Sequence, residues 1–131
     1  EIPEIIDNQA DEFSDLRFIN HINKELNKLY NLLNKNTVLI LAPVTTPLHL
    51  KKKNNILKSK IKSDENVNRL RIINLINEQI KSFQKKNVIY FDTIKILKKY
   101  ENEKVFIDDC CHLSKNGALK ISEHLNEILN E

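Results

Sequence analysis

The chain has a single glycine, Gly117, among its 131 residues. Glycine provides the positive φ angles and the close backbone approach that several nucleotide-binding and catalytic loops require. The P-loop, the G-x-G-x-x-G dinucleotide turn and the G-x-S-x-G nucleophile elbow each need at least two glycines. The sequence therefore encodes none of these three motifs.

Length and composition predict one small globular domain over residues 1–131. With 40% hydrophobic and 30% charged residues, the chain can bury a core but is too short for two domains. It contains no methionine and begins at Glu1, a residue too large for ordinary removal of an initiator methionine to expose. We therefore expect a piece of a longer protein.

The charge balance favours neither a nucleic acid nor a membrane as partner. Lys and Arg number 21 against 18 Asp and Glu, and a net charge of +3 is too mild to indicate nucleic-acid binding. The longest apolar run, residues 38–44, is far shorter than the roughly 20 residues that span a bilayer. Cys110 and Cys111 are adjacent and do not make a disulfide framework, so the cellular compartment stays open.

Hydrophobic periodicity predicts helices that alternate with short strands. Apolar spacings of three or four indicate helices at residues 11–34, 65–86, 93–100 and 114–130. Continuous aliphatic and β-branched runs at 37–43 and 87–92 indicate strands covered on both faces, as in a parallel sheet. This alternation is typical of an α/β layered domain with a right-handed parallel crossover.

Two short strands alone make a poor sheet, because stable sheets usually need three or more strands or heavy helical cover. Residues 2–6 could add a third strand, although Pro3 restricts it to an edge or to a strand start. The predicted architecture therefore also looks truncated.

The most informative segment precedes the last helix and reads Phe106-Ile-Asp-Asp-Cys-Cys-His-Leu-Ser-Lys-Asn-Gly117. Asp109 and His112 are three residues apart in a tight loop, so the carboxylate can reach the imidazole and fix its tautomer. The other ring nitrogen is then free to act as a general base. Ser114 can cap the last helix, and Gly117 allows that helix to approach the backbone beside it closely.

The block Asp109-x-x-His112-Leu-Ser-x-x-Gly117, followed by an amphipathic helix, resembles the last conserved block of the SGNH (GDSL-type) hydrolases. The resemblance implies an α/β fold with a three-layer flavodoxin-like parallel sheet and helices on both faces. This chain would be its C-terminal part, without the N-terminal strands. It also implies a serine esterase or acyltransferase without a cofactor, acting on a small-molecule or glycan ester. In that family, His112 would be the general base and Asp109 its orienting acid.

The chain departs from the family in lacking a Gly-Asp-Ser nucleophile block. Ser14 lies inside a helical pattern with no preceding strand or glycine, so we reject it as the nucleophile. Asn8 lies about where the family's oxyanion Asn would be, but Ile6 replaces the glycine two residues earlier. We therefore expect an N-terminal segment of the same protein to supply the serine, and these 131 residues alone to be nearly inert.

Simpler interpretations of the same loop remain open. An Asp-x-x-His pair is often only a salt bridge at the entry to a helix, and Asp108 could replace Asp109 as the acid. Cys110, Cys111 and His112, with the two aspartates, could also be proposed as metal ligands. They lack the paired C-x-x-C spacing of zinc sites, so we expect no metal.

Two further alternatives lie outside the loop. His49 follows the first predicted strand, where ligands of open α/β sheets bind, and could contact a substrate. The alternative function is a non-catalytic α/β binding module that keeps the scaffold and binds a partner chain through an exposed sheet edge.

Overall fold

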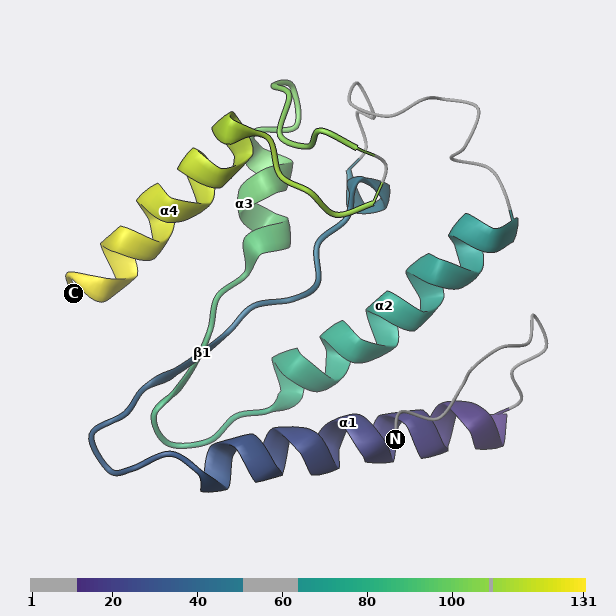
Figure 1. Ribbon diagram of the computed structural model, residues 1–131, viewed down its shortest axis with the longest axis vertical. Helices are drawn as coiled ribbons and strands as arrows, with labels where there is room; N and C mark the ends of the chain where they lie inside the picture. The colour runs from purple at the N-terminus through teal and green to yellow at the C-terminus, as the bar shows by residue number, and fades with distance from the viewer. Residues whose placement is uncertain (1–11, 51–63, 109) are drawn as a thin grey trace.

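The computed structural model describes residues 12–50, 64–108 and 110–131. In chain order its elements are α1 (Glu12–Asn31), β1 (Leu39–Leu41), the 3-10 turn η1 (Pro47–His49), α2 (Asp64–Ser82), β2 (Val88–Tyr90), α3 (Thr93–Lys99) and α4 (Lys115–Leu129) (Figure 1). This order confirms the predicted helices and the two predicted central strands. The possible strand at residues 2–6 lies outside the described residues, as does Asn8.

The two strands pair in parallel, as the sequence predicts, with Leu39 opposite Val88 and Leu41 opposite Tyr90. Each strand has three residues and is shorter than its apolar run. Pro43 follows β1 closely and has no backbone N–H to continue a ladder. The described part of the chain is therefore a mixed α/β structure with four helices and a small two-stranded parallel sheet.

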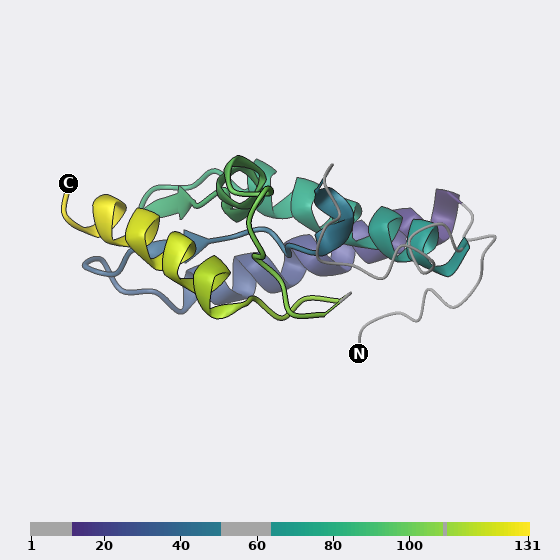
Figure 2. The ribbon, with the colours of Figure 1, turned by 90° about the horizontal axis from the view of Figure 1, so that it is seen from above.

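Helix pairs flank the strands. Figure 1 shows α1 and α2 side by side on one side of the strands, with α3 and α4 on the other. Figure 2, seen from above, shows these elements in a flat arrangement. Arg71 of α2 holds α1 by donating from Nη1 to both carboxylate oxygens of Asp15, at 2.9 and 2.7 Å. Asn23 of α1 donates to Gln79 of α2 at 2.9 Å.

The expectation that both strands are covered on both faces is only partly right. All three residues of β1 are half-buried, and Ile89 in the middle of β2 is 37% exposed. Ile89 is exposed because no described element fully covers its face of β2. The expectation of a small sheet built on two short central strands is confirmed for the described residues.

Helical periodicity also predicts some side chains as inward that are in fact exposed. Their exposed fractions range from 42% to 65%, and they are Leu16, Leu29, Val67, Leu119 and Leu129. By contrast Phe18, which is not among the apolar positions spaced three or four apart in α1, is only 5% exposed. Spacing identifies an apolar face, but whether that face is buried depends on which elements lie against it.

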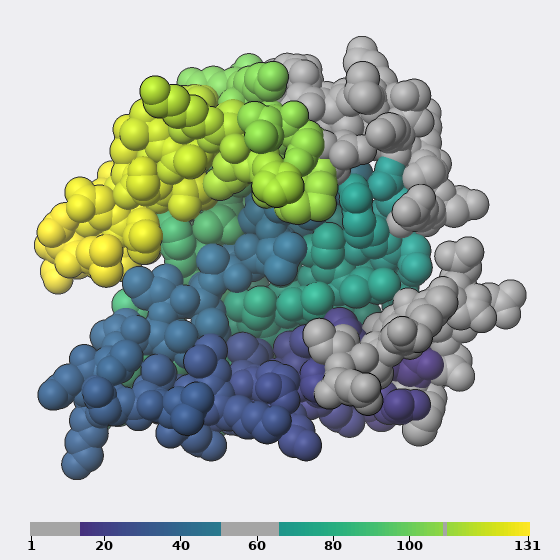
Figure 3. Space-filling model, in the orientation of Figure 1, coloured from purple at the N-terminus to yellow at the C-terminus, as the bar shows by residue number. Residues whose placement is uncertain are grey.

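The best-buried core lies at the α3–α4 end of the fold. Its members are at most 2% exposed and comprise Leu50, Leu97, Val105 and Phe106. Phe106 is the first residue of the loop that precedes α4 and Val105 lies just before it, so this end of the loop is anchored in the core. Figure 3 shows this loop, in yellow-green, against the segment that follows β1, in blue.

Candidate active site

The loop before α4 is closed by its own backbone. Phe106 and Leu113 form an isolated antiparallel bridge, and the amide of Ile107 donates to the His112 carbonyl at 3.0 Å. These contacts bring the two ends of the loop together. The residues between them, including Asp108 and His112, therefore project from a short, closed turn.

Ser114 and Gly117 fix the start of α4, as the sequence predicts. The Ser114 hydroxyl accepts from the Gly117 amide at 3.0 Å and donates to the Lys104 carbonyl at 2.5 Å. A Cβ atom at Gly117 would overlap the carbonyl oxygen of Val105, so only glycine lets α4 lie this close to the loop. Helix and loop are thus locked together on the C-terminal side of His112.

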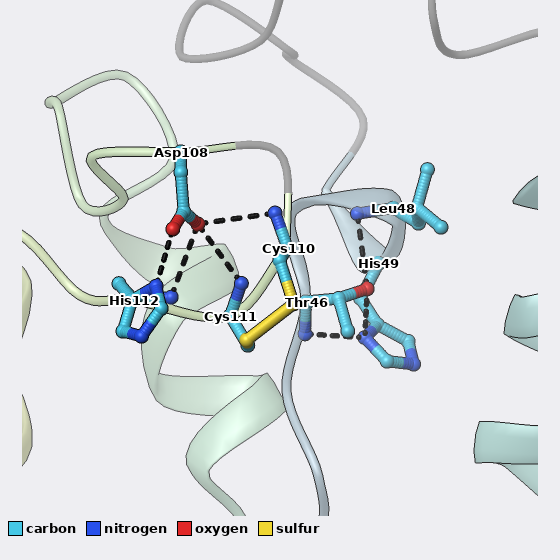
Figure 4. Close-up of a disulfide and its surroundings, with 7 residues drawn as sticks. All are labelled: Thr46, Leu48, His49, Asp108, Cys110, Cys111 and His112. Carbon is cyan, nitrogen blue, oxygen red and sulfur yellow. Dashed lines mark hydrogen bonds and ion pairs between the residues drawn. A yellow bond between two sulfur atoms is a disulfide. The ribbon is translucent and has the colours of Figure 1, made fainter.

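Asp108 organises the interior of the loop (Figure 4). Its Oδ1 atom accepts from the amides of Cys110 and Cys111 at 3.0 Å each and from the amide of His112 at 3.2 Å. Its Oδ2 atom is bonded to Nδ1 of the His112 ring. The bond to His112, and then the backbone amides, hold the pKa of the Asp108 carboxyl well below its usual range.

Asp108, the alternative acid, is thus in contact with His112. The two residues are four apart, and they meet because three consecutive amides turn the chain around one carboxylate oxygen. Asp109 lies outside the described residues, so a contact between Asp109 and His112 stays a prediction.

The far side of the His112 ring is accessible. The side chain of His112 is 70% exposed and that of Asp108 is 35% exposed. An ionised carboxylate only accepts hydrogen bonds, so Nδ1 carries a proton, and in the neutral imidazole Nε2 is then the acceptor. No described residue bonds Nε2, and Figure 4 shows that edge of the ring directed away from Asp108.

A cleft of about 210 Å³ adjoins the loop at the carboxyl ends of the two strands, where open α/β sheets bind ligands. Its lining comes from the segments after β1 and β2, from the loop and from α4: Ala42, Pro43, Thr45, Thr93, Leu97, Cys111, Leu113 and Ile121. Cys111 and Leu113 are the two neighbours of His112. A larger hollow of about 520 Å³ near Tyr30 and Lys86 has no acid, histidine or cysteine in its lining.

Polar residues that the sequence pattern does not single out hold the segments at the ends of the two strands. Asn77 of α2 is 8% exposed; its Oδ1 accepts from the Val44 amide at 2.7 Å and its Nδ2 donates to the Val44 carbonyl at 2.8 Å. The hydroxyls of Thr45 and Thr93 lie 2.8 Å apart and join the ends of the two strands. A polar residue next to the apolar stripe of α2 is the one signal that could have indicated Asn77.

The other candidate residues take different positions. Nδ1 of His49 accepts from the Thr46 amide at 3.1 Å, and Nε2 lies 3.2 Å from Oδ1 of Asn74. Both ring nitrogens thus have protein partners, and a substrate contact of His49 stays a prediction.

Ser14 lies in α1, as the pattern indicates. Cys110 and Cys111 form a disulfide, so neither is a free thiol.

The described ranges hold neither a metal-binding cluster nor a membrane-spanning helix. In residues 12–50, 64–108 and 110–131, no three His, Cys, Asp or Glu side chains are grouped so that they could hold a metal ion. Within the same ranges, each helix is too short or too polar to cross a membrane.

Comparison of the chain with protein-family models, curated proteins and solved structures finds no match. A proposal for the function therefore has to be argued from the chemistry of the loop and the cleft.

The lowered pKa of Asp108 predicts how the stability of the fold changes at low pH. A carboxyl whose pKa is depressed by folding stabilises the fold above its unfolded value of about 3.9, and this stabilisation is lost as the pH falls through the folded value. The carboxyl ¹³C resonance of Asp108 should titrate below that value, and His112→Gln should raise the midpoint because the largest cause is gone. An ordinary midpoint in the wild-type chain would contradict the geometry.

Proposed function

We propose that this chain supplies the acid–base half of a serine ester hydrolase of SGNH type, with His112 as general base and Asp108 as the acid that orients it. One observation carries the proposal: an exposed imidazole is held through Nδ1 by a carboxylate beside a cleft at the carboxyl ends of parallel strands. With the proton on Nδ1, Nε2 can accept the proton of an attacking hydroxyl.

The proposed reaction is acyl transfer. A serine supplied from outside these residues attacks the carbonyl of a small-molecule or glycan ester, and Nε2 of His112 takes its proton. Asp108 stabilises the resulting imidazolium. His112 then protonates the leaving alkoxide. In the second half, His112 activates a water, or an acceptor hydroxyl in an acyltransferase, to release the acyl group from the serine.

The proposed fold is the three-layer, flavodoxin-like α/β domain of these enzymes. The parallel β1–α2–β2 unit supports it, as do the helix pairs on opposite sides of the strands. Under this proposal, an N-terminal segment of the same protein adds strands beside β1 and brings the serine and most of the oxyanion hole to the cleft.

The choice between the two acids can be tested directly. Asp108→Asn keeps the shape of the side chain but removes the charge that fixes the tautomer of His112. In the protein that joins this chain to its nucleophile segment, we expect kcat for an ester to fall about 10²–10⁴-fold. Asp109→Asn is the matched variant and should cost far less. The reverse order would give the orienting role to Asp109, as the family resemblance implies.

Hydrolysis of p-nitrophenyl acetate tests the proposed reaction itself. The longer protein, in which this chain follows the proposed serine-bearing segment, is called the joined protein here. It should hydrolyse the ester, whereas the 131-residue chain should be nearly inert because it lacks the nucleophile. Turnover by the chain alone that survives His112→Ala would refute the assignment. If the segment that precedes this chain has no serine after an apolar strand, the binding module becomes the better proposal, with the edge of β1 that has no described neighbour as its contact surface.

A further inference from the structure

We propose that the Cys110–Cys111 disulfide is a reversible redox switch that sets the position of His112 against Asp108. The disulfide has no part in the proposed acyl transfer, yet it lies between the two residues of the acid–base pair (Figure 4). Its effect on catalysis rests on the proposed function, whereas its effect on the loop does not.

The disulfide and Asp108 constrain the same peptide group. The carboxylate accepts from the amides of both cysteines, and the disulfide joins the side chains of those two adjacent residues. The bond therefore closes a small ring around the peptide that links Cys110 to Cys111. When it opens, both side chains can take independent rotamers and the linking peptide gains backbone freedom. The amide and the ring of His112, one residue further on, then lose part of their support.

The position of the disulfide also makes it accessible and connects it to the cleft. Cys111 is exposed, and exposed disulfides are the ones that small thiols reduce most readily. The same residue lines the cleft next to His112. A change in the oxidation state of Cys111 therefore alters both the position of the imidazole and the shape of the cleft wall.

The chemistry needs one co-reactant, a low-molecular-weight disulfide. A thiolate of one cysteine attacks that disulfide, forms a mixed disulfide and releases one small thiol. The thiolate of the other cysteine then attacks the mixed disulfide, closes the Cys110–Cys111 bond and releases a second small thiol. Two protein thiols are oxidised and one small disulfide is reduced. A small dithiol reverses the process by the same exchange.

The direct test compares the oxidised and the dithiothreitol-reduced forms of the isotope-labelled 131-residue chain by NMR. Reduction should move the amide resonances of Cys110, Cys111 and His112 and raise the titration midpoint of the Asp108 carboxyl, because amide donors leave the carboxylate. The amide of Lys95 is the internal control: the Asp92 side chain holds it at 3.0 Å at the start of α3, with no disulfide nearby.

A double variant keeps the test independent of the reductant. Cys110→Ser with Cys111→Ser should resemble the reduced chain, with or without dithiothreitol. In the joined protein, reduction should lower kcat by about tenfold or more, since a small misplacement of a catalytic group is costly. Oxidised glutathione should restore kcat in the wild type but not in the double variant.

The possible results separate the two proposals. The switch is overturned if the loop amides and the Asp108 midpoint are the same in both redox states, or if oxidised glutathione leaves two thiols that still alkylate. It is also overturned if the loop responds while kcat of an active joined protein does not. If the loop responds as expected but the joined protein hydrolyses no ester, the redox element of the loop stands and the proposed function fails.

Discussion

Replacing His112 with glutamine should abolish ester hydrolysis in the longer protein proposed above, which carries the serine, with kcat falling at least about 10⁴-fold. The glutamine side chain is neutral and has no basic nitrogen, so it cannot take the proton of the serine. His112 is 70% exposed, so its replacement leaves the core intact. The variant should therefore still fold, and the loss should appear in kcat.

His21→Gln is the matched control. It is the same substitution in α1, on the element farthest along the chain from the loop, and it should leave kcat unchanged. Steady-state kinetics with p-nitrophenyl acetate measure both variants. Wild-type kcat in the His112→Gln variant would show that His112 is not the general base, whichever residue is the nucleophile.

Gly117→Ala should destabilise the fold by about 2 kcal/mol, against the usual preference of helices for alanine. Alanine gains up to about 1 kcal/mol over glycine in a helix interior. Here, however, the new methyl group would overlap the Val105 carbonyl, and backbone cannot rotate away as the end of a flexible side chain can. Overpacking of this kind typically costs about 1–3 kcal/mol and occasionally more.

Ala118, the next residue along α4, provides the control for Gly117→Ala. Ala118 is exposed on α4, so Ala118→Gly should report helix propensity alone and cost about 1 kcal/mol. Urea unfolding followed by circular dichroism gives the free energy of unfolding for both variants. A Gly117→Ala chain that is as stable as the wild type would show that α4 can move away from Val105 at no cost.

Local features of this chain could be predicted from the sequence because their causes are local. Ser114 caps α4 through an amide three residues away, and Gly117 contacts the segment just before the loop. The parallel pairing of β1 with β2 follows from the strand–helix–strand order, since a long crossover connects them. These predictions needed no knowledge of what lies farther along the chain.

The contacts that the sequence did not predict depend on how distant or tightly turned segments meet. Spacing alone gave no reason to choose Asp108 as the acid, because its contact with His112 requires three amides to converge on one oxygen. Burial of Asn77 depends on α2 lying against the segment after β1. Leu119 is exposed although its spacing marks the apolar face of α4, because no described element packs over it.

Asn77 has one more consequence, for the length of the sheet. A carboxamide carries the same donor and acceptor as a peptide group, so at Val44 the second helix substitutes for a neighbouring strand. While these two bonds are made, Val44 cannot pair with a strand on the side that faces Asn77. A strand added on that side would therefore stop pairing before Val44, at the end of the strand where the cleft lies.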